Sequence, residues 1–178
     1  MDDESQIRDV YAHFGLAMYL AQCLEQSVFM HLMFFDFFPR NVLEFTDQQN
    51  WREKFDRYES VELGKTMGRL IQTLKDAGQP TDEIKSVLAN ALIERNRLVH
   101  TYFSEKSVAF VTEFGRGEMI SELESIQDMF RTAAVMIDTI TMPVARGYGF
   151  TEEMEARAKL EMIESYGKEP LWKSSRGD

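Results

Sequence analysis

Hydrophobic residues recur at three- and four-residue intervals along most of the chain, which is the spacing typical of amphipathic helices. Pro39 and Pro143 follow two of the strongest runs and are expected to end the helices there. Together, the hydrophobic runs and these prolines predict helices over residues 5–38, 59–75, 81–103, 118–142 and 151–165.

Two segments lack this strong periodicity. Residues 40–59 are expected to form a connector whose aromatic side chains cover the bundle, and residues 104–117 a loop with a strand-like turn. No strand pattern is strong enough to build a sheet. The sequence therefore predicts an all-α fold, an antiparallel four-helix up-and-down bundle over residues 1–145. Residues 146–178 are expected to form a C-terminal helical extension and a flexible tail.

The second half of the first predicted helix, residues 28–38, is apolar almost all round. A helix of this kind is buried on more than one side, because it has no polar face to turn toward water. Either other helices of the same bundle or a second subunit would cover it.

Composition and charge narrow the class of protein. The chain of 178 residues, 44% hydrophobic and 28% charged, fits one soluble globular domain with a proper core. A net charge of −10 argues against binding nucleic acid through a generally basic surface, although it leaves room for a compact basic cleft. The single cysteine, Cys23, excludes an internal disulfide and a cysteine-based zinc site.

Membrane and secretory signals are missing from the sequence. The most hydrophobic stretch, residues 14–38, contains polar interruptions and falls short of the ~20 nearly continuous apolar residues that a membrane-spanning helix needs. The first residues lack the basic and apolar segments of a secretory signal. We therefore expect a cytoplasmic protein without a membrane partner.

Common catalytic and cofactor-binding motifs are also missing. The sequence has no glycine-rich nucleotide loop, no His-Glu-x-x-His zinc motif and no Gly-x-Ser-x-Gly nucleophile motif. It lacks the Glu-x-x-His pairs that hold two irons inside a four-helix bundle. The sequence therefore predicts no metal and no cofactor.

Residues 91–103 carry polar side chains in unusual places. On an ideal helix, Arg95 and Tyr102 fall in the middle of the apolar stripe of this segment. A guanidinium group there is costly unless it is paired or borders a cleft. Asn96 and His100 lie one turn apart on the flank, where side chains four residues apart touch.

The pattern of Arg95, four residues, His100, one residue and Tyr102 resembles the motif of the toxin branch of the HEPN superfamily. In that family the motif lies at the end of the third helix of a small α-helical bundle. Residues 62–71 also resemble the second-helix pattern of many HEPN and abortive-infection proteins. The resemblance covers roughly residues 5–142. It implies a metal-independent endoribonuclease that acts as a homodimer, in a toxin or phage-defence role, with an antitoxin or nucleotidyltransferase as partner.

The resemblance also implies roles for individual residues. The 2′-hydroxyl of RNA is the internal nucleophile, so the protein has to move protons and stabilise charge. His100 is expected to act as acid or base, Arg95 to stabilise the phosphate and Asn96 to orient the imidazole. Tyr102 is also a candidate target for modification by the nucleotidyltransferase. The candidates for substrate binding are Tyr102, Arg97, Lys65 and Arg69.

One geometric constraint bears on this interpretation. Arg95 and His100 are five residues apart, so ~140° separates them on a regular helix. Both reach one site only if the helix distorts or a second chain supplies complementary groups, as a HEPN dimer does. The apolar end of the first helix offers a surface for such a dimer.

Two alternatives stay open: a non-catalytic HEPN-like binding or regulatory module, and an unrelated helical interaction protein. Pairing of Arg95 inside the core of one chain would weigh against the nuclease.

Overall fold

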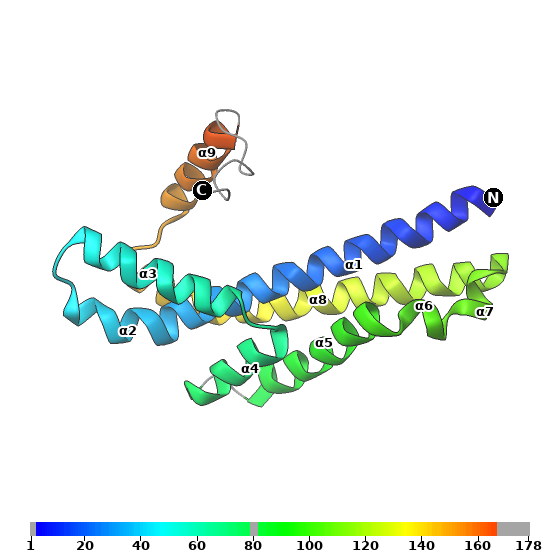
Figure 1. The fold of residues 1–178 in the computed structure, drawn as a ribbon, viewed down its shortest axis with the longest axis horizontal. Helices are drawn as coiled ribbons and strands as arrows, with labels where there is room; N and C mark the ends of the chain where they lie inside the picture. Colours follow the sequence, from blue (N-terminus) through cyan, green and yellow to red (C-terminus); the bar gives the residue numbers. More distant parts are fainter. Residues whose placement is uncertain (1–2, 79–81, 167–178) are drawn as a thin grey trace, which may run out of the picture. The chain divides into compact units, whose positions relative to one another are not determined.

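The computed structural model describes residues 3–78 and 82–166, which are helical apart from short turns (Figure 1). None of these residues forms a β-strand, which confirms the all-α prediction. The chain divides into two compact units, Met1–Thr141 and Met142–Asp178.

The first unit holds most of the helices. Its elements, in chain order, are α1 (Asp3–Leu32), the π-helical turn η1 (Met33–Phe37), α2 (Phe38–Asn41), the 3-10 turn η2 (Val42–Glu44), α3 (Gln48–Leu63), α4 (Met67–Asp76), α5 (Asp82–His100), α6 (Tyr102–Glu105), α7 (Ser107–Phe110) and the part of α8 (Glu113–Gly147) that reaches Thr141.

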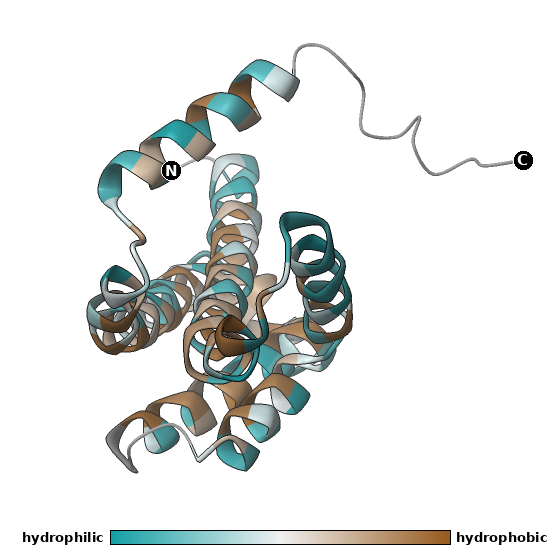
Figure 2. Ribbon diagram, turned by 90° about the vertical axis from the view of Figure 1, so that its left-hand side faces the viewer, coloured by the Kyte–Doolittle hydropathy of each residue, from teal (hydrophilic) through white to brown (hydrophobic). Residues whose placement is uncertain are grey.

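One hydrophobic core joins α1, α4, α5 and α8. Each of these helices carries hydrophobic and hydrophilic residues on different sides, visible as alternating colours along the ribbons in Figure 2, and turns its apolar side inward. Fully or almost fully buried members of this core are Leu24, Leu70, Leu88, Leu123 and Phe130.

Hydrogen bonds between α1 and α8 show that these two helices run in the same direction. From the beginning of α1 to its end, the bonded pairs are Gln6–Glu113, His13–Gln127 and His31–Thr141. The residue numbers rise together along both helices, so the helices are parallel. Helix α5 runs the opposite way: Glu25 of α1 pairs with Arg95 of α5. Phe14, about three turns earlier on α1, packs on Tyr102, beyond the end of α5.

The expected connector over residues 40–59 is wrong in its main part, because most of it belongs to the 16-residue helix α3. Asp47 caps the N-terminus of α3, and its side chain accepts a hydrogen bond from the backbone N–H of Asn50 at 2.9 Å. This hydrogen bond lowers the pKa of the Asp47 carboxyl below its usual value. A capped helix therefore stands where the weak periodicity indicates a connector.

Helix α3 packs on the apolar end of α1 and on η1. Its aromatic residues Trp51, Phe55 and Tyr58, spaced three and four residues apart, all contact the buried ring of Phe37. The aromatic cover expected from this segment is therefore confirmed, although a helix supplies it.

Two consequences follow from α3. A helix inserted between α1 and α4 reverses the chain once more, so α1 and α8 are parallel, whereas simple four-helix alternation would make them antiparallel. The apolar end of α1 is covered by α3 of the same chain, so it is not the open dimer surface that the sequence suggests.

Neither Pro39 nor Pro143 ends its helix as predicted. Before Pro39, the chain widens into η1, where the N–H of Phe38 donates to the carbonyl of Met33, five residues back. Pro39 then lies in the first turn of α2, where a backbone N–H needs no helical partner. Pro143 lies inside α8, which continues to Gly147.

Two other boundaries also differ from the prediction. The helix expected over residues 59–75 is divided, because α3 ends at Leu63, Gly64 follows as its C-cap and α4 begins at Met67. The loop expected over residues 104–117 consists mainly of helical turns, namely α6, α7 and the start of α8.

The second unit contains the end of α8, a turn and α9 (Glu152–Tyr166). Gly149 in the turn has a φ of +87°, a conformation that glycine adopts without strain. Every residue of α9 is exposed. The expected flexible tail lies outside the described residues from Gly167 onward. Among the helices described, none is both long and apolar enough to cross a membrane.

Gly115 is the position where a side chain is least tolerated. A Cβ atom there would lie 2.6 Å from the Cα atom of Ala109, because α7 passes close to the first turn of α8. Gly15, inside α1, has no atom within 4 Å of such a Cβ. We expect Gly115→Ala to lower the free energy of unfolding by about 1–3 kcal/mol. Gly15→Ala should raise it by about 1 kcal/mol.

Urea denaturation of both variants and the wild type measures these two changes in the free energy of unfolding. A stable Gly115→Ala protein would contradict the close packing of α7 on α8, and a destabilised Gly15→Ala protein would contradict the open space beside Gly15 on α1.

Candidate functional site

The residues of the Arg-x4-His-x-Tyr motif lie at the end of α5 and the beginning of α6, in the first unit. Helix α5 ends at His100, and Thr101 has non-helical backbone angles, with a φ of −132° and a ψ of −17°. Tyr102 therefore begins a separate short helix, and its side chain does not follow the regular spacing of α5.

Arg95 is paired with a residue of another helix. Its Nε atom lies 3.3 Å from Oε1 of Glu25 on α1, and the two side chains are 24% and 23% exposed. Its Nη1 atom donates to Oδ1 of Asn96 in a long hydrogen bond of 3.4 Å. The guanidinium on the apolar side of α5 thus has the partner that its burial requires.

His100 and Asn96 are both exposed on α5. Within residues 3–78 and 82–166, the imidazole of His100 forms no hydrogen bond or ion pair. The Asn96 amide bonds to Arg95 and not to the imidazole that it is predicted to orient. His100 is therefore an accessible side chain that is open to a ligand.

Tyr102 faces the core. Its side chain is fully buried, its ring packs on Phe14 and Phe103, and its hydroxyl donates to the backbone carbonyl of Met119 at 3.3 Å. Burial is the main cause that raises the pKa of Tyr102 above its usual value, and the charge of Glu122 adds to it. The predicted substrate-binding and modification site on this hydroxyl does not reach the surface.

Arg97 is surrounded by carboxylates. It forms ion pairs with Glu94 and Glu122 at 2.8 Å each and with Glu105 at 3.3 Å. Its guanidinium also lies over the ring of Tyr102, 5.3 Å from the ring centroid. Burial opposes the charged form, but the hydrogen bonds to the three glutamates raise the pKa of Arg97 above its usual value. The predicted contact with substrate would have to displace these partners.

Lys65 and Arg69 belong to another part of the chain, just before α4 and on α4. Lys65 follows α3 and contacts the buried carboxylate of Glu62 at 2.6 and 2.7 Å, and it donates to Thr73 at 2.9 Å. Arg69 is exposed on α4. In the described part of the chain, neither cation forms a hydrogen bond or ion pair with the residues of the motif. The predicted cations do not gather into one basic cleft.

Glu25 is the neighbour of the motif that the sequence interpretation missed. It lies seven residues after Met18 and eleven after Phe14, so all three share one side of α1. A carboxylate on the same side as two core residues is a signal for a buried partner. Its pairing with Arg95 becomes visible only once α1 and α5 are placed side by side.

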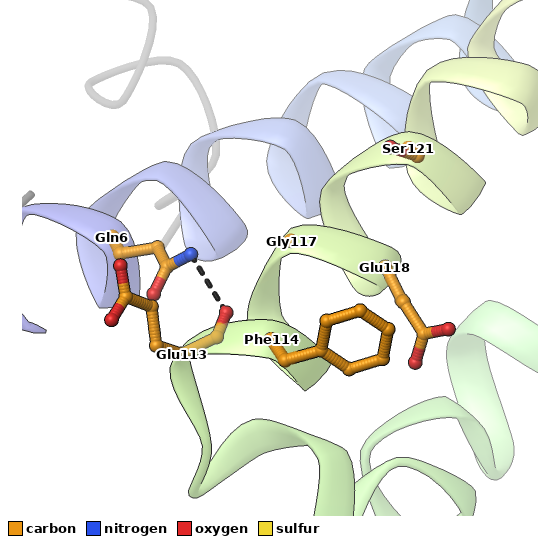
Figure 3. Close-up of a pocket in the computed structure, with 6 residues that line it drawn as sticks. All are labelled: Gln6, Glu113, Phe114, Gly117, Glu118 and Ser121. Carbon is orange, nitrogen blue, oxygen red and sulfur yellow. Dashed lines mark hydrogen bonds between the residues drawn. The ribbon is translucent and has the colours of Figure 1, made fainter.

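A groove of the first unit contains none of the predicted residues. It has a volume of about 1010 Å³ and lies where α1 and α8 begin (Figure 3). Two carboxylates and no cation line it, which is a poor match for a polyanion. Its lining residues are Gln6, Glu113, Phe114, Gly117, Glu118 and Ser121.

In the part of the chain that the structure describes, no group of three or more His, Cys, Asp or Glu side chains could hold a metal ion. No family model, curated protein or solved structure matches the chain. The resemblance to HEPN proteins therefore depends on the motif and on where its residues lie.

Replacing Arg97 by alanine should destabilise the fold in a pH-dependent way. At pH 7 the variant leaves three glutamates without their shared cation, and we expect a loss of about 2 kcal/mol in the free energy of unfolding, discounted for partial exposure. A hydrogen bond from Thr101, together with one from Arg97 and the charge of Arg97, holds the pKa of Glu105 below its usual value. A carboxyl with a lowered folded pKa stabilises the fold above its unfolded pKa, and this contribution is lost as the pH falls.

The difference between wild type and Arg97→Ala should therefore shrink as the pH is lowered through about 4. Urea denaturation at pH 7, 5 and 4 measures it. Arg131→Ala is the matched control, because Arg131 pairs with the exposed Asp128 and should cost little. A loss that is constant across this pH range would contradict the assigned network.

Proposed function

We propose that the chain is a metal-independent endoribonuclease of the HEPN type. The observation that carries the proposal is the accessible imidazole of His100 at the end of α5, five residues after an arginine that is still partly exposed. A histidine side chain ordinarily titrates near neutral pH, so it can both accept and donate a proton. A partly exposed guanidinium nearby suits a phosphate.

The proposed reaction uses the substrate's own nucleophile. The 2′-oxygen of a ribose attacks the adjacent phosphorus, the bond from phosphorus to the 5′-oxygen breaks, and a cyclic phosphate and a free 5′-hydroxyl result. A base removes the proton of the 2′-hydroxyl and an acid protonates the leaving 5′-oxygen; His100 fills one of these roles. Arg95 stabilises the negative charge that develops on the phosphate.

A homodimer belongs to the proposal, because one chain supplies a single histidine at the motif. A second copy would bring a second His100 for the other proton transfer. Exposed apolar side chains on α1 and α5, namely Tyr11, Tyr19 and Val99, are available for a contact with a second copy. The proposal also includes a cytoplasmic toxin or phage-defence role with an antitoxin or nucleotidyltransferase partner.

A second candidate function is a non-catalytic HEPN-like binding or regulatory module. The specific observation that favours it is the charge around the motif: Arg95 is paired with Glu25, and Arg97 with three glutamates. These pairs leave little positive potential to attract RNA, in a chain of net charge −10.

The test is RNA cleavage in EDTA by the purified chain, followed with a mixed-sequence RNA labelled at one end. Wild type should release fragments that end in a cyclic phosphate. His100→Ala and Arg95→Ala should each lower the rate about 100-fold or more. Arg131→Ala removes an exposed arginine of α8 and should leave the rate unchanged.

Cleavage that persists in both variants, or that never appears with any RNA, would refute the nuclease. RNA with 2′-O-methyl groups must resist cleavage, since it lacks the nucleophile. The module predicts instead that His100→Ala keeps full partner binding. Size-exclusion chromatography with light-scattering detection reports whether the chain is a dimer.

A further inference from the structure

We propose that Glu25 is a positioning residue of this site: its carboxylate holds the Arg95 guanidinium by Nε, so that the edge formed by Nη1 and Nη2 is presented to the substrate phosphate. This inference rests on the proposed nuclease function, and it adds a residue from outside the motif.

The first support is the place of the contact on the guanidinium. The group is planar and carries five N–H donors in a fixed fork. Glu25 approaches it at Nε, at 3.3 Å. With Nε engaged, the two terminal nitrogens remain as the pair of donors that can hold two phosphate oxygens side by side.

The second support is what the terminal nitrogens contact. Nη1 makes only the 3.4 Å hydrogen bond to Asn96, which is at the long limit of a hydrogen bond. Nη2 donates no hydrogen bond within residues 3–78 and 82–166. Arg95 therefore keeps donors that a ligand can use, without giving up its contact with Glu25.

Arg97 differs from Arg95 in the number of carboxylates that surround its guanidinium. Arg97 has three carboxylates and uses Nε, Nη1 and Nη2 on them. Arg95 pairs with one carboxylate, that of Glu25, and the contact is at Nε. The two arginines lie two residues apart on the same helix, yet only Arg95 has capacity left for an anion. The structure thus separates a positioned guanidinium from a saturated one.

The third support is that Glu25 belongs to another helix. Because its side chain is about three-quarters buried, the ion pair is screened less by solvent than an exposed pair would be. Pairing across α1 and α5 fixes Arg95 against two helices, and not against its own helix alone. Holding a charged group in place before the substrate arrives lowers the cost of reaching the transition state.

The test compares Glu25→Ala with Glu25→Gln in the full chain, using the cleavage assay in EDTA. Glu25→Ala should lower kcat about 10-fold to 100-fold and change KM much less, because Arg95 loses its orientation and keeps its charge. Glu25→Gln keeps the length of the side chain but loses the charge of the ion pair, so it should lower kcat as well. If Glu25→Ala does not fold, Glu25→Asp takes its place. It withdraws the carboxylate from Arg95 by one methylene, so it should also lower kcat.

Glu44→Ala is the matched control, because it also removes a glutamate from an ion pair between two segments, here with Lys54 at 3.1 Å. It should leave kcat and KM unchanged. Thermal unfolding followed by circular dichroism confirms that each variant is folded at the assay temperature.

Several outcomes would overturn the inference. If Glu25→Ala keeps the wild-type kcat, the ion pair has only a structural role. If Glu25→Ala is faster, Glu25 competes with the phosphate for Arg95. In both cases the nuclease itself still stands if His100→Ala is inactive. If the wild type cleaves no RNA, the proposed function and the role of Glu25 fall together.

Discussion

The apolar second half of α1 needs cover on all sides, and the first unit is arranged to supply it. Helices α4, α5 and α8 bury its core side, and α3 covers the continuation into η1 with three aromatic residues. Because the chain itself provides all of this cover, α1 acts as the central element against which the other helices are placed. The register of α5 against α1, and hence the meeting of Arg95 and Glu25, depends on this packing.

The neighbourhood of the motif combines a rigid core with a few accessible groups. Tyr102 anchors the end of α5 through its buried ring and its bond to Met119, while His100, two residues earlier, remains exposed. The break at Thr101 lies between the two, so one short segment carries both a buried and an exposed side chain. A side chain that the motif alone would assign to the substrate instead fixes the position of the residues before it.

The sequence predicts the long helices well, but it says little about which side chains of different helices pair with each other. The long apolar periods of α1, α5 and α8 predict those helices and most of their buried residues. For α3, the spacing of Trp51, Phe55 and Tyr58 is only partly helical, so the sequence indicates a connector with turns or a short helix where a 16-residue helix forms, although the capping residue Asp47 is visible in the sequence. The pairing of Arg95 with Glu25 joins residues 70 positions apart in the chain, and no local pattern contains it. The burial of Tyr102 agrees with its place in the apolar stripe, whereas nothing in the periodicity indicates the break at Thr101.

The parallel course of α1 and α8 has an electrostatic consequence at their beginnings. Each helix concentrates partial positive charge at its first turn, and parallel neighbours bring two such ends together, which is unfavourable. Acidic residues occupy both first turns, Asp3 and Glu4 on α1 and Glu113 on α8, and they offset this repulsion. The acidic character of this end of the unit therefore compensates for helix direction. One of these first-turn carboxylates, Glu113, lines the groove in Figure 3 together with Glu118.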